Sequence, residues 1–328
     1  MIRFGVIGAG QIAHTFSKAI TCTEGILYGI ASRNIEKARL YQKEYGYQVA
    51  YGSYEELVKD ELVDCVYVAT PHGLHYEHMK LAITHGKHVL CEKSFTINAS
   101  QAEEIFELAK KHNVFVMEAM WTRFLPTMLE LKKDIDAMVI GNIESIDVTF
   151  GFDAMQKPKN RLFDPDMGGG ALLDIGVYTL TIAHLFLGLP TSFDTQVDLI
   201  DHQFDIAHQI TLHYHSSTVH MSCALNQDLE NKVYLNGSKG YAVIDLFWRT
   251  EKANIYDLNH HLIKTIAHPH LVNGFEYEIQ EVIECIKNHE LESSIMTHKT
   301  TLEIMHLMDD IRKVWKLKYP GESIKQDI

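Results

Sequence analysis

Short β-branched runs alternate with helical patterns over the first 118 residues, and this alternation constrains the fold more than any other feature of the sequence. Strands are expected at 3–7, 27–31, 63–69, 88–91 and 114–118, with a weaker one at 47–50, and helices at 11–20, 35–45, 54–60, 75–85 and 99–112. Strands joined through single helices form a parallel sheet by right-handed crossovers, with helices on both faces. The alternation therefore predicts an α/β fold that begins with a doubly wound domain.

The hydrophobic period changes after about residue 121. In the segments 146–150, 210–214 and 219–225, apolar side chains alternate with more polar ones, as in an antiparallel sheet that is covered on one face. Further strands are expected at 232–235, 241–246, 254–258 and 262–266, and helices around 275–286 and 302–315. We therefore predict two domains, a doubly wound one at 1–120 and an α+β one at 121–328, which agrees with about 150 residues per domain.

The charge balance of the chain limits the kinds of molecule that it is expected to bind. The chain has 30 Lys and Arg against 43 Asp and Glu, a net charge of −13 without a local basic patch, so neither nucleic acid nor a membrane is expected as a partner. The apolar stretch 169–189 contains Asp174 and His184, which predicts a buried helix. No signal-peptide pattern precedes the first strand, and the five cysteines form no C-x-x-C pair, so we expect a cytoplasmic protein with reduced cysteines.

A glycine-rich turn follows the first expected strand, with the sequence Gly8-Ala9-Gly10-Gln11-Ile12-Ala13. Gly8 permits a tight turn, Gly10 lets the backbone approach a pyrophosphate, and the small Ala13 permits close helix packing. The N–H groups at the start of the helix, from Gln11 and Ile12 onward, would face the phosphates. This pattern between a strand and a helix predicts a dinucleotide site rather than a plain tight turn.

The second expected strand ends at Ala31-Ser32-Arg33, where an NAD site would carry an acid for the ribose 2′-hydroxyl. A hydroxyl and a guanidinium suit a 2′-phosphate instead, so NADP(H) is favoured over NAD(H). Alternatively, Ser32 only caps the next helix and Arg33 is solvated, which would still leave the acid missing.

Five further segments follow in order: Thr70-Pro71-His72-Gly73-Leu74-His75, 86–93 with Glu92-Lys93, 118–126, 161–165 and 168–178. Together with the glycine turn they resemble the Gfo/Idh/MocA oxidoreductase family, and the later ones look most like its dimeric dihydrodiol dehydrogenase and D-xylose dehydrogenase branch. The resemblance spans nearly the whole chain.

The resemblance implies an NAD(P)-binding Rossmann domain at 1–120 and a C-terminal domain at 121–328 with a large open sheet, which binds substrate and forms a homodimer. It also implies hydride transfer between NADP(H) and a hydroxyl or carbonyl of a sugar, polyol or cyclic diol. Lys93 would be the active-site lysine, Tyr178 the acid/base residue that other branches replace with His, and Asp174 the family's aspartate. Ser94 departs from the usual E-K-P and leaves the loop conformation open.

The expected chemistry is consistent with these positions. Lys93 follows the carboxyl end of a parallel strand, where open α/β sheets bind ligands, and Asp174 and Tyr178 are four apart on one expected helix. A nearby Lys cation lowers the pKa of a phenol, so Tyr178 could take the proton of an alcohol while the hydride leaves carbon. Asp174 would bind a second substrate hydroxyl or orient Lys93. Alternatively, Lys93 is solvated and Tyr178 is a core aromatic.

The resemblance places other residues around the site. Near the cofactor it implies Thr70, Pro71, His75, Glu92, Trp121 and Arg123, and near the substrate Trp121, Phe152, Arg161 and Trp248. Two tryptophans suit stacking on sugar or cyclic-diol faces, although any single aromatic is as easily core. The 20 histidines suggest a metal, but His72, His75 and His78 spread around a helix without further ligands, so no metal is expected.

Two alternatives to a dehydrogenase stay open. One is a non-catalytic NAD(P)-sensing regulator of the same fold, which need not keep Lys93, Asp174 and Tyr178. The other is a glycosidase with tightly bound NAD, which Arg33 and Tyr178 make less suitable.

Overall fold

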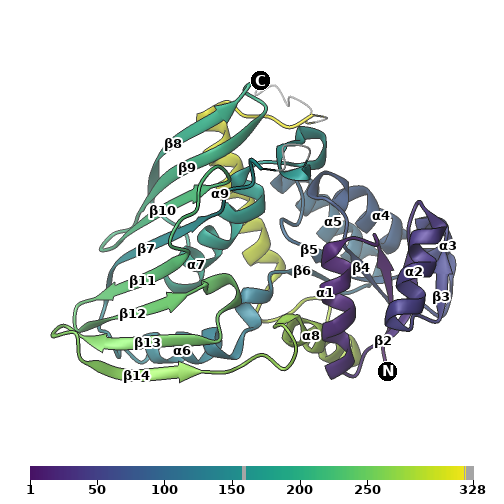
Figure 1. Ribbon diagram of the computed structural model, residues 1–328, viewed down its shortest axis with the longest axis horizontal. Coiled ribbons are helices and arrows are strands. Elements are labelled where there is room, and N and C mark those ends of the chain that lie inside the picture. Colours follow the sequence, from purple (N-terminus) through teal and green to yellow (C-terminus); the bar gives the residue numbers. More distant parts are fainter. Residues whose placement is uncertain (157–159, 321, 323–328) are drawn as a thin grey trace. The chain divides into compact units, whose positions relative to one another are not determined.

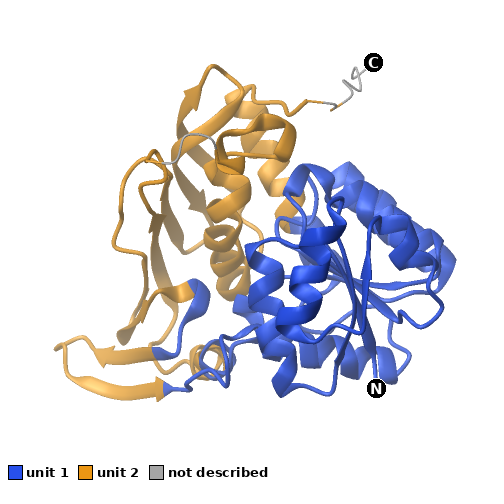
Figure 2. Ribbon diagram, turned by 45° about the vertical axis from the view of Figure 1, so that its right-hand side comes forward, with its two compact units in different colours: residues 1–130, 248–252, 267–303 blue, residues 131–247, 253–266, 304–328 orange. Residues whose placement is uncertain are grey.

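The computed structural model describes residues 1–156, 160–320 and 322 (Figure 1). The chain forms two compact units (Figure 2). Unit 1 consists of Met1–Glu130, Trp248–Lys252 and Ala267–Glu303, and unit 2 of Leu131–Phe247, Ala253–Ile266 and Ile304–Ile328. The chain therefore returns twice to unit 1 after it has begun unit 2, so no single residue separates the two units.

Unit 1 contains a six-stranded parallel sheet in the order β3-β2-β1-β4-β5-β6. The strands are β1 (Arg3–Ile7), β2 (Ile26–Ala31), β3 (Val49–Tyr51), β4 (Cys65–Val68), β5 (His88–Glu92) and β6 (Val116–Ala119). The order reverses between β1 and β4, and open α/β sheets bind ligands at the carboxyl ends of the strands beside such a reversal. The predicted doubly wound sheet is confirmed.

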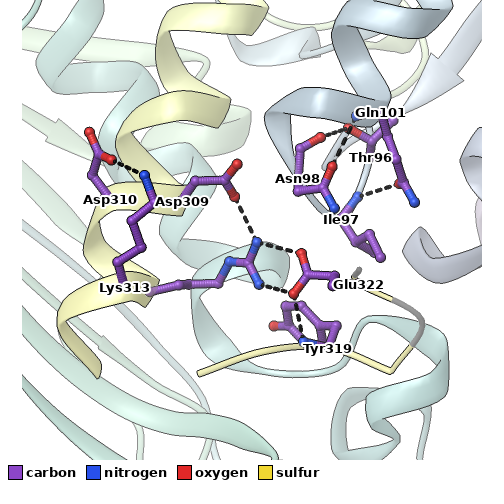
Figure 3. Close-up of polar contacts among 10 residues, drawn as sticks. Thr96, Ile97, Asn98, Gln101, Asp309, Asp310, Lys313, Tyr319 and Glu322 are labelled. Atoms are coloured by element: carbon purple, nitrogen blue, oxygen red, sulfur yellow. Dashed lines mark hydrogen bonds and ion pairs between the residues drawn. The ribbon is translucent and has the colours of Figure 1, made fainter. Parts of the chain in front are cut away.

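Helices alternate with these strands, and local signals fix their ends. They are α1 (Gln11–Ala19), α2 (Ile35–Tyr45), α3 (Tyr54–Lys59), α4 (His75–Thr84) and α5 (Ala99–His112), and α8 (Phe275–Lys287) packs against α1. Asn98 begins α5 by accepting a hydrogen bond from the Gln101 N–H at 2.9 Å (Figure 3). Asn113, with φ of 54°, ends it in the left-handed conformation.

Unit 2 is built on an eight-stranded sheet in the order β14-β13-β12-β11-β7-β10-β9-β8. Its strands are β7 (Ile143–Gly151), β8 (Ser192–Ile200), β9 (Phe204–His213), β10 (Thr218–Ala224), β11 (Lys232–Gly237), β12 (Gly240–Asp245), β13 (Lys252–Asp257) and β14 (Leu262–Ala267). β7 and β10 are parallel, whereas β8 with β9, β9 with β10, β7 with β11, β11 with β12 and β12 with β13 are antiparallel. The predicted mostly antiparallel sheet is confirmed, and β8 is a strand that the sequence pattern did not predict.

Helices α7 (Val177–Leu187) and α9 (His298–Trp315) lie on one face of the large sheet (Figure 1). The opposite face carries no helix within the described part of the chain. A second unpredicted element, α6 (Pro126–Asp136), precedes the sheet. Pro165–Leu187 is long and apolar enough to span a membrane by length and composition alone, and 78% of its most apolar window is buried inside the protein.

A π-helical turn, Leu172–Gly176, immediately precedes α7. Asp174 lies in this turn and Tyr178 in the first turn of α7. The prediction of one regular α-helix through both residues is therefore wrong, because each π-helical hydrogen bond spans one residue more than an α-helical one. Such single π turns occur frequently at functional sites.

Candidate functional site

The turn after β1 requires glycine at its first position. Gly8 has a φ of +101°, and a Cβ added there would lie 2.9 Å from the carbonyl oxygen of Ala69. The Gly8 N–H donates to the carbonyl oxygen of Ala31 at 3.1 Å. The turn is thus held against the ends of β2 and β4, at the reversal of strand order.

Gly10 is a glycine for a different reason. A Cβ at Gly10 would meet nothing within 4 Å, so the backbone there faces open space. Gly10 is also the N-cap of α1, no side chain among the described residues caps this helix, and its first turn contains no acid. The N–H groups of the first turn, including those of Gln11 and Ile12, can therefore face a pyrophosphate, and these residues fit a dinucleotide. Ala13 is fully buried, as expected for the small residue that lets this helix pack closely.

Tyr41 is a neighbour of the turn that the motifs did not reveal. Its hydroxyl, on α2, donates to the Gly10 carbonyl oxygen at 3.0 Å. This contact fixes the peptide that begins α1.

Ser32 and Arg33 follow β2 in different environments. Ser32 is buried, and its Oγ accepts from the Asn34 N–H at 3.2 Å, whereas Asn34 itself is the N-cap of α2. Arg33 is exposed, and its positive charge acts on Tyr54 and His78. Arg33 therefore lies at the carboxyl ends of the strands, in a polar cluster with Tyr54 and His78.

His78 joins this cluster to the next loop. Its Nδ1 lies 2.9 Å from Thr70 Oγ1, and its ring contacts that of Tyr54 edge to face, with centroids 4.7 Å apart. Burial, followed by the charge of Arg33, lowers the pKa of His78 to about 4. His78 is therefore neutral at pH 7 and leaves Arg33 as the cation of the cluster.

His75 ties two loops together. The fully buried ring places Nε2 2.7 Å from the carbonyl oxygen of Thr70 and Nδ1 2.9 Å from that of Ser94. Burial lowers the pKa of His75 to about 4, although the backbone carbonyls oppose this effect. The side chain thus holds the segment around Thr70 and Pro71 next to the end of β5. Among the described residues, no group of three or more His, Cys, Asp or Glu could hold a metal ion.

Lys93 is half-buried directly after β5, among carboxylates. Glu92 accepts a hydrogen bond from the hydroxyl of buried Tyr67, and the Lys93–Ser94 peptide bond is cis. Glu118, a fully buried acid that sequence reasoning missed as a site residue, accepts from the Phe95 N–H at 3.1 Å. Burial raises the pKa of Glu118 to about 7, while hydrogen bonds and the nearby charge of Lys93 act in the opposite direction.

Trp121 and Arg123 are held by other segments of unit 1. Trp121 packs on Phe275 of α8, with ring centroids 4.7 Å apart. The Arg123 Nε donates to the carbonyl oxygen of Ile295 at 3.0 Å, and burial lowers the pKa of Arg123 to about 10. Trp248 is half-buried, and its carbonyl oxygen accepts from the Thr122 hydroxyl at 2.8 Å.

In unit 2, four predicted residues lie on neighbouring elements. Asp174 is buried and accepts from Arg161 Nη2 at 2.8 Å, whereas the Arg161 side chain is 44% exposed. Tyr178 is buried, with its ring centroid 5.8 Å from that of Phe150, and half-buried Phe152 directly follows β7. The structure thus joins Asp174 to Arg161, a pairing that the spacing did not predict. Lys93 belongs to unit 1 and Tyr178 to unit 2, so their pairing stays a prediction.

Comparison with known proteins identifies relatives along the whole chain. A model of the Gfo/Idh/MocA oxidoreductase family with an NAD-binding Rossmann fold matches residues 2–120, and one of the Gfo/Idh/MocA C-terminal domain matches residues 128–243. The trans-1,2-dihydrobenzene-1,2-diol dehydrogenase of Xenopus tropicalis is 31% identical, over 97% of this chain and 99% of its own. The scyllo-inositol 2-dehydrogenase (NADP+) of Bacillus subtilis is 30% identical, over 98% and 100%. The D-xylose 1-dehydrogenase (NADP+) of Hypocrea jecorina is 30% identical, over 100% and 95%.

Solved structures of other proteins match the fold of nearly the whole chain. A 3-ketoreductase from Actinomadura kijaniata in complex with NADP and TDP-benzene has a TM-score of 0.86 and 27% identity, over 95% of this chain and 97% of its own. A levoglucosan dehydrogenase in complex with NADH and levoglucosan has a TM-score of 0.85 at 19% identity, over 95% and 96%, and so shows the fold alone. The named relatives are dehydrogenases, and the predicted family is confirmed. The chain is an oxidoreductase that belongs to the Gfo/Idh/MocA family.

Proposed function

We propose that the chain is an NADP(H)-dependent dehydrogenase that acts on a hydroxyl or carbonyl group of a sugar, another polyol or a cyclic diol. The observation that carries this proposal is the burial of Asp174 and Tyr178 within 171–183, a stretch that is buried throughout. Burying a carboxylate and a phenol in an apolar helix costs free energy, and a sensor that only binds NAD(P) gains nothing from it. Relatives named for diol, inositol and xylose oxidation support this substrate class.

The cofactor preference rests on the end of β2. Arg33 and the Ser32 hydroxyl stand where NAD-binding sites carry an acid, and His78 beside them is neutral at pH 7. A guanidinium and a hydroxyl favour a 2′-phosphate by charge-assisted hydrogen bonding. Two of the relatives are named as NADP-dependent enzymes.

For the reaction we propose Tyr178 as the acid/base residue. The bound nicotinamide would supply or accept the hydride. Tyr178 Oη would accept the proton of the substrate hydroxyl, and the ammonium of Lys93 would favour the phenolate. Arg161 Nη2 donates to the Asp174 carboxylate at 2.8 Å, and this carboxylate would also accept a hydrogen bond from a second substrate hydroxyl.

The assembly and location are part of the same proposal. We expect a homodimer through the face of the eight-stranded sheet that α7 and α9 leave uncovered, which light scattering of the purified protein can test. On this sheet Tyr241 and Tyr256 stack as a cross-strand pair, with centroids 5.0 Å apart. A cytoplasmic location agrees with five unpaired cysteines.

The test is reduction of NADP+ in the presence of a panel of aldoses, inositols and cyclic diols, with Lys93→Met and Tyr178→Phe as matched variants. We expect turnover of at least one panel compound and its loss in both variants, with NADPH binding retained by Tyr178→Phe. NADPH binding without turnover of any panel compound would favour the sensor.

A further inference from the structure

A bulge in β9 brings a buried acid and a buried histidine together. Opposite β8, Asp198 pairs with Ala207 and Leu199 pairs with Asp205, so Ile206 has no partner of its own. Residues three apart in a regular strand point to opposite faces, but a bulge changes this alternation. Asp205 and His208 are accordingly both buried, and His208 Nδ1 lies 2.8 Å from Asp205 Oδ2.

The Asp205–His208 pair contacts both ends of the π-helical turn. The same Asp205 Oδ2 accepts from the N–H of Leu172, the first residue of the turn, at 2.8 Å. At the last residue, a Cβ on Gly176 would lie 3.1 Å from His208 Cε1, so the ring rests against this glycine. Asp174 lies between these two points of contact.

The two glycines before the turn lie close to Asp205 and to Tyr319. A Cβ on Gly170 would lie 2.5 Å from Asp205 Oδ1, and the hydroxyl of Tyr319 donates to the Gly169 carbonyl oxygen at 2.8 Å. Figure 3 shows Tyr319 with Glu322, whose carboxylate accepts from the Tyr319 N–H at 2.8 Å. Arg312, which is 4% exposed, binds Glu322 at 2.8 Å. The segment 169–176 is thus held at several points.

Burying an ion pair in a protein core costs free energy, because both charged groups lose their hydration. Burial alone would lower the pKa of His208, but Cys223 opposite and the Asp205 carboxylate raise it above its ordinary value. Apolar side chains of the same volume would often stabilise a core as well or better. The Asp205–His208 pair therefore contributes more to the position of the π-helical turn than to the stability of the core.

We propose that Asp205 and His208 are positioning residues, which anchor the π-helical turn and so hold the Asp174 carboxylate where the substrate needs it. The inference rests on the proposed function, since Asp174 is a site residue only if the chain is a polyol or diol dehydrogenase. Neither residue is catalytic, because both act through the backbone of the turn.

The first test compares two Asp–His pairs on the same sheet. Asp205→Asn and His208→Gln are matched with Asp194→Asn, which removes a charge from the Asp194–His213 pair, also 2.8 Å apart but with side chains 84% and 39% exposed. We expect kcat to fall about 100-fold in the buried variants and by less than about twofold in the control, with NADPH affinity unchanged. Buried variants that fold and match the control in kcat overturn the proposal.

A double-mutant cycle separates placement from general stability. In the Asp174→Asn background, Asp205→Asn should lower kcat by less than about threefold further, because the group that it positions is already gone. Full additivity of the two losses contradicts the proposal. If Asp205→Asn does not fold, Gly176→Ala takes its place, because its Cβ would lie 3.1 Å from His208 Cε1 and from Leu172 Cδ1 and so press on the ring without removing either charge.

Amide hydrogen exchange tests the anchor without any substrate. Asp205→Asn should speed exchange in the peptide 170–178 while β10 stays as protected as in the wild type. Equal acceleration over both segments makes the pair an ordinary part of the core and overturns the inference. A wild-type chain that turns over no panel compound refutes the proposed function instead, and exchange still decides whether the anchor exists.

Discussion

The glycine turn of unit 1 and the π-helical turn of unit 2 depend on different kinds of groups. The first uses backbone groups, since Gly8 packs against the end of β4 and Gly10 leaves space over uncapped N–H groups. The second uses buried side chains, with Asp174 held by Arg161 and the turn held by Asp205. Any sequence that permits the turn supplies backbone groups, but each buried polar side chain needs its own partner. The glycine turn should therefore respond mainly to added atoms, whereas the π-helical turn should respond also to the removal of side-chain atoms.

The largest effect expected from removing atoms is that of Tyr178→Phe. Without the phenol oxygen, kcat should fall by about 10²–10⁴-fold, which is the range for general acid–base groups, while NADPH affinity stays the same. Steady-state kinetics and fluorescence titration measure the two quantities. Tyr214→Phe is the matched control in unit 2, since its hydroxyl donates to the Gly188 carbonyl oxygen at 3.1 Å and has no proposed part in the reaction. Equal kcat values for both variants would refute the assignment.

Glu118 is an exception to this difference between the two units, because it is a buried polar side chain in unit 1. Its pKa is raised from 4.5 to about 7 by burial, so between these values the folded state keeps a proton that the unfolded chain releases. The free energy of unfolding should therefore fall as pH rises through this window, by up to about 3 kcal/mol from this group.

Urea denaturation at several pH values measures this effect, and Glu118→Gln should remove most of the decline. The exposed Glu107→Gln is the control and should keep the wild-type pH dependence. A decline that persists unchanged in Glu118→Gln assigns the titration to another group.

An added methyl group should have different effects at the two glycines, lowering stability at Gly8 and cofactor affinity at Gly10. Gly8→Ala places a Cβ at φ of +101° and 2.9 Å from a carbonyl oxygen, so it should lower the free energy of unfolding by about 2 kcal/mol. Gly10→Ala meets no protein atom within 4 Å and should change stability by less than about 1 kcal/mol. Yet NADPH should bind about tenfold more weakly to Gly10→Ala, because the new methyl group fills the place of the pyrophosphate. Wild-type affinity in Gly10→Ala would refute the expected position of the cofactor.

The effect that is limited to one of the two cofactors concerns the 2′-phosphate of NADP(H). Arg33→Ala should raise the KM for NADP+ about tenfold and leave that for NAD+ unchanged, as expected for one charge-assisted hydrogen bond. Arg39→Ala is the control, since this exposed arginine on α2 pairs with Glu36 at 2.6 Å. An equal rise for both cofactors would show that Arg33 does not select between them.

Local signals made much of unit 1 predictable. The ranges 35–45 and 99–112 agree with α2 and α5 at both ends, because a polar N-cap and a left-handed residue mark the boundaries. Strand β1 and the glycine turn depend likewise on neighbouring residues. The return of 248–252 and 267–303 to unit 1 depends on contacts far along the chain and leaves no local trace.

The missed elements lack such signals. In β8, exposed side chains alternate with half-buried ones, so an edge strand such as Ser192–Ile200 shows little contrast between its faces. The Asp205–His208 pair needs a bulge, which only the register with β8 reveals. The role of His78 depends on Thr70 and Tyr54, which reach it from separate elements.

The packing of α8 against α1 has a consequence for synthesis of the chain. Domains generally begin to fold from the N-terminus while translation continues. Here the apolar face of α8, which includes Ile279, Val282 and Ile283, emerges only after most of unit 2. During synthesis, helix α1 therefore lacks its cover from α8 until the chain has been made at least as far as Lys287.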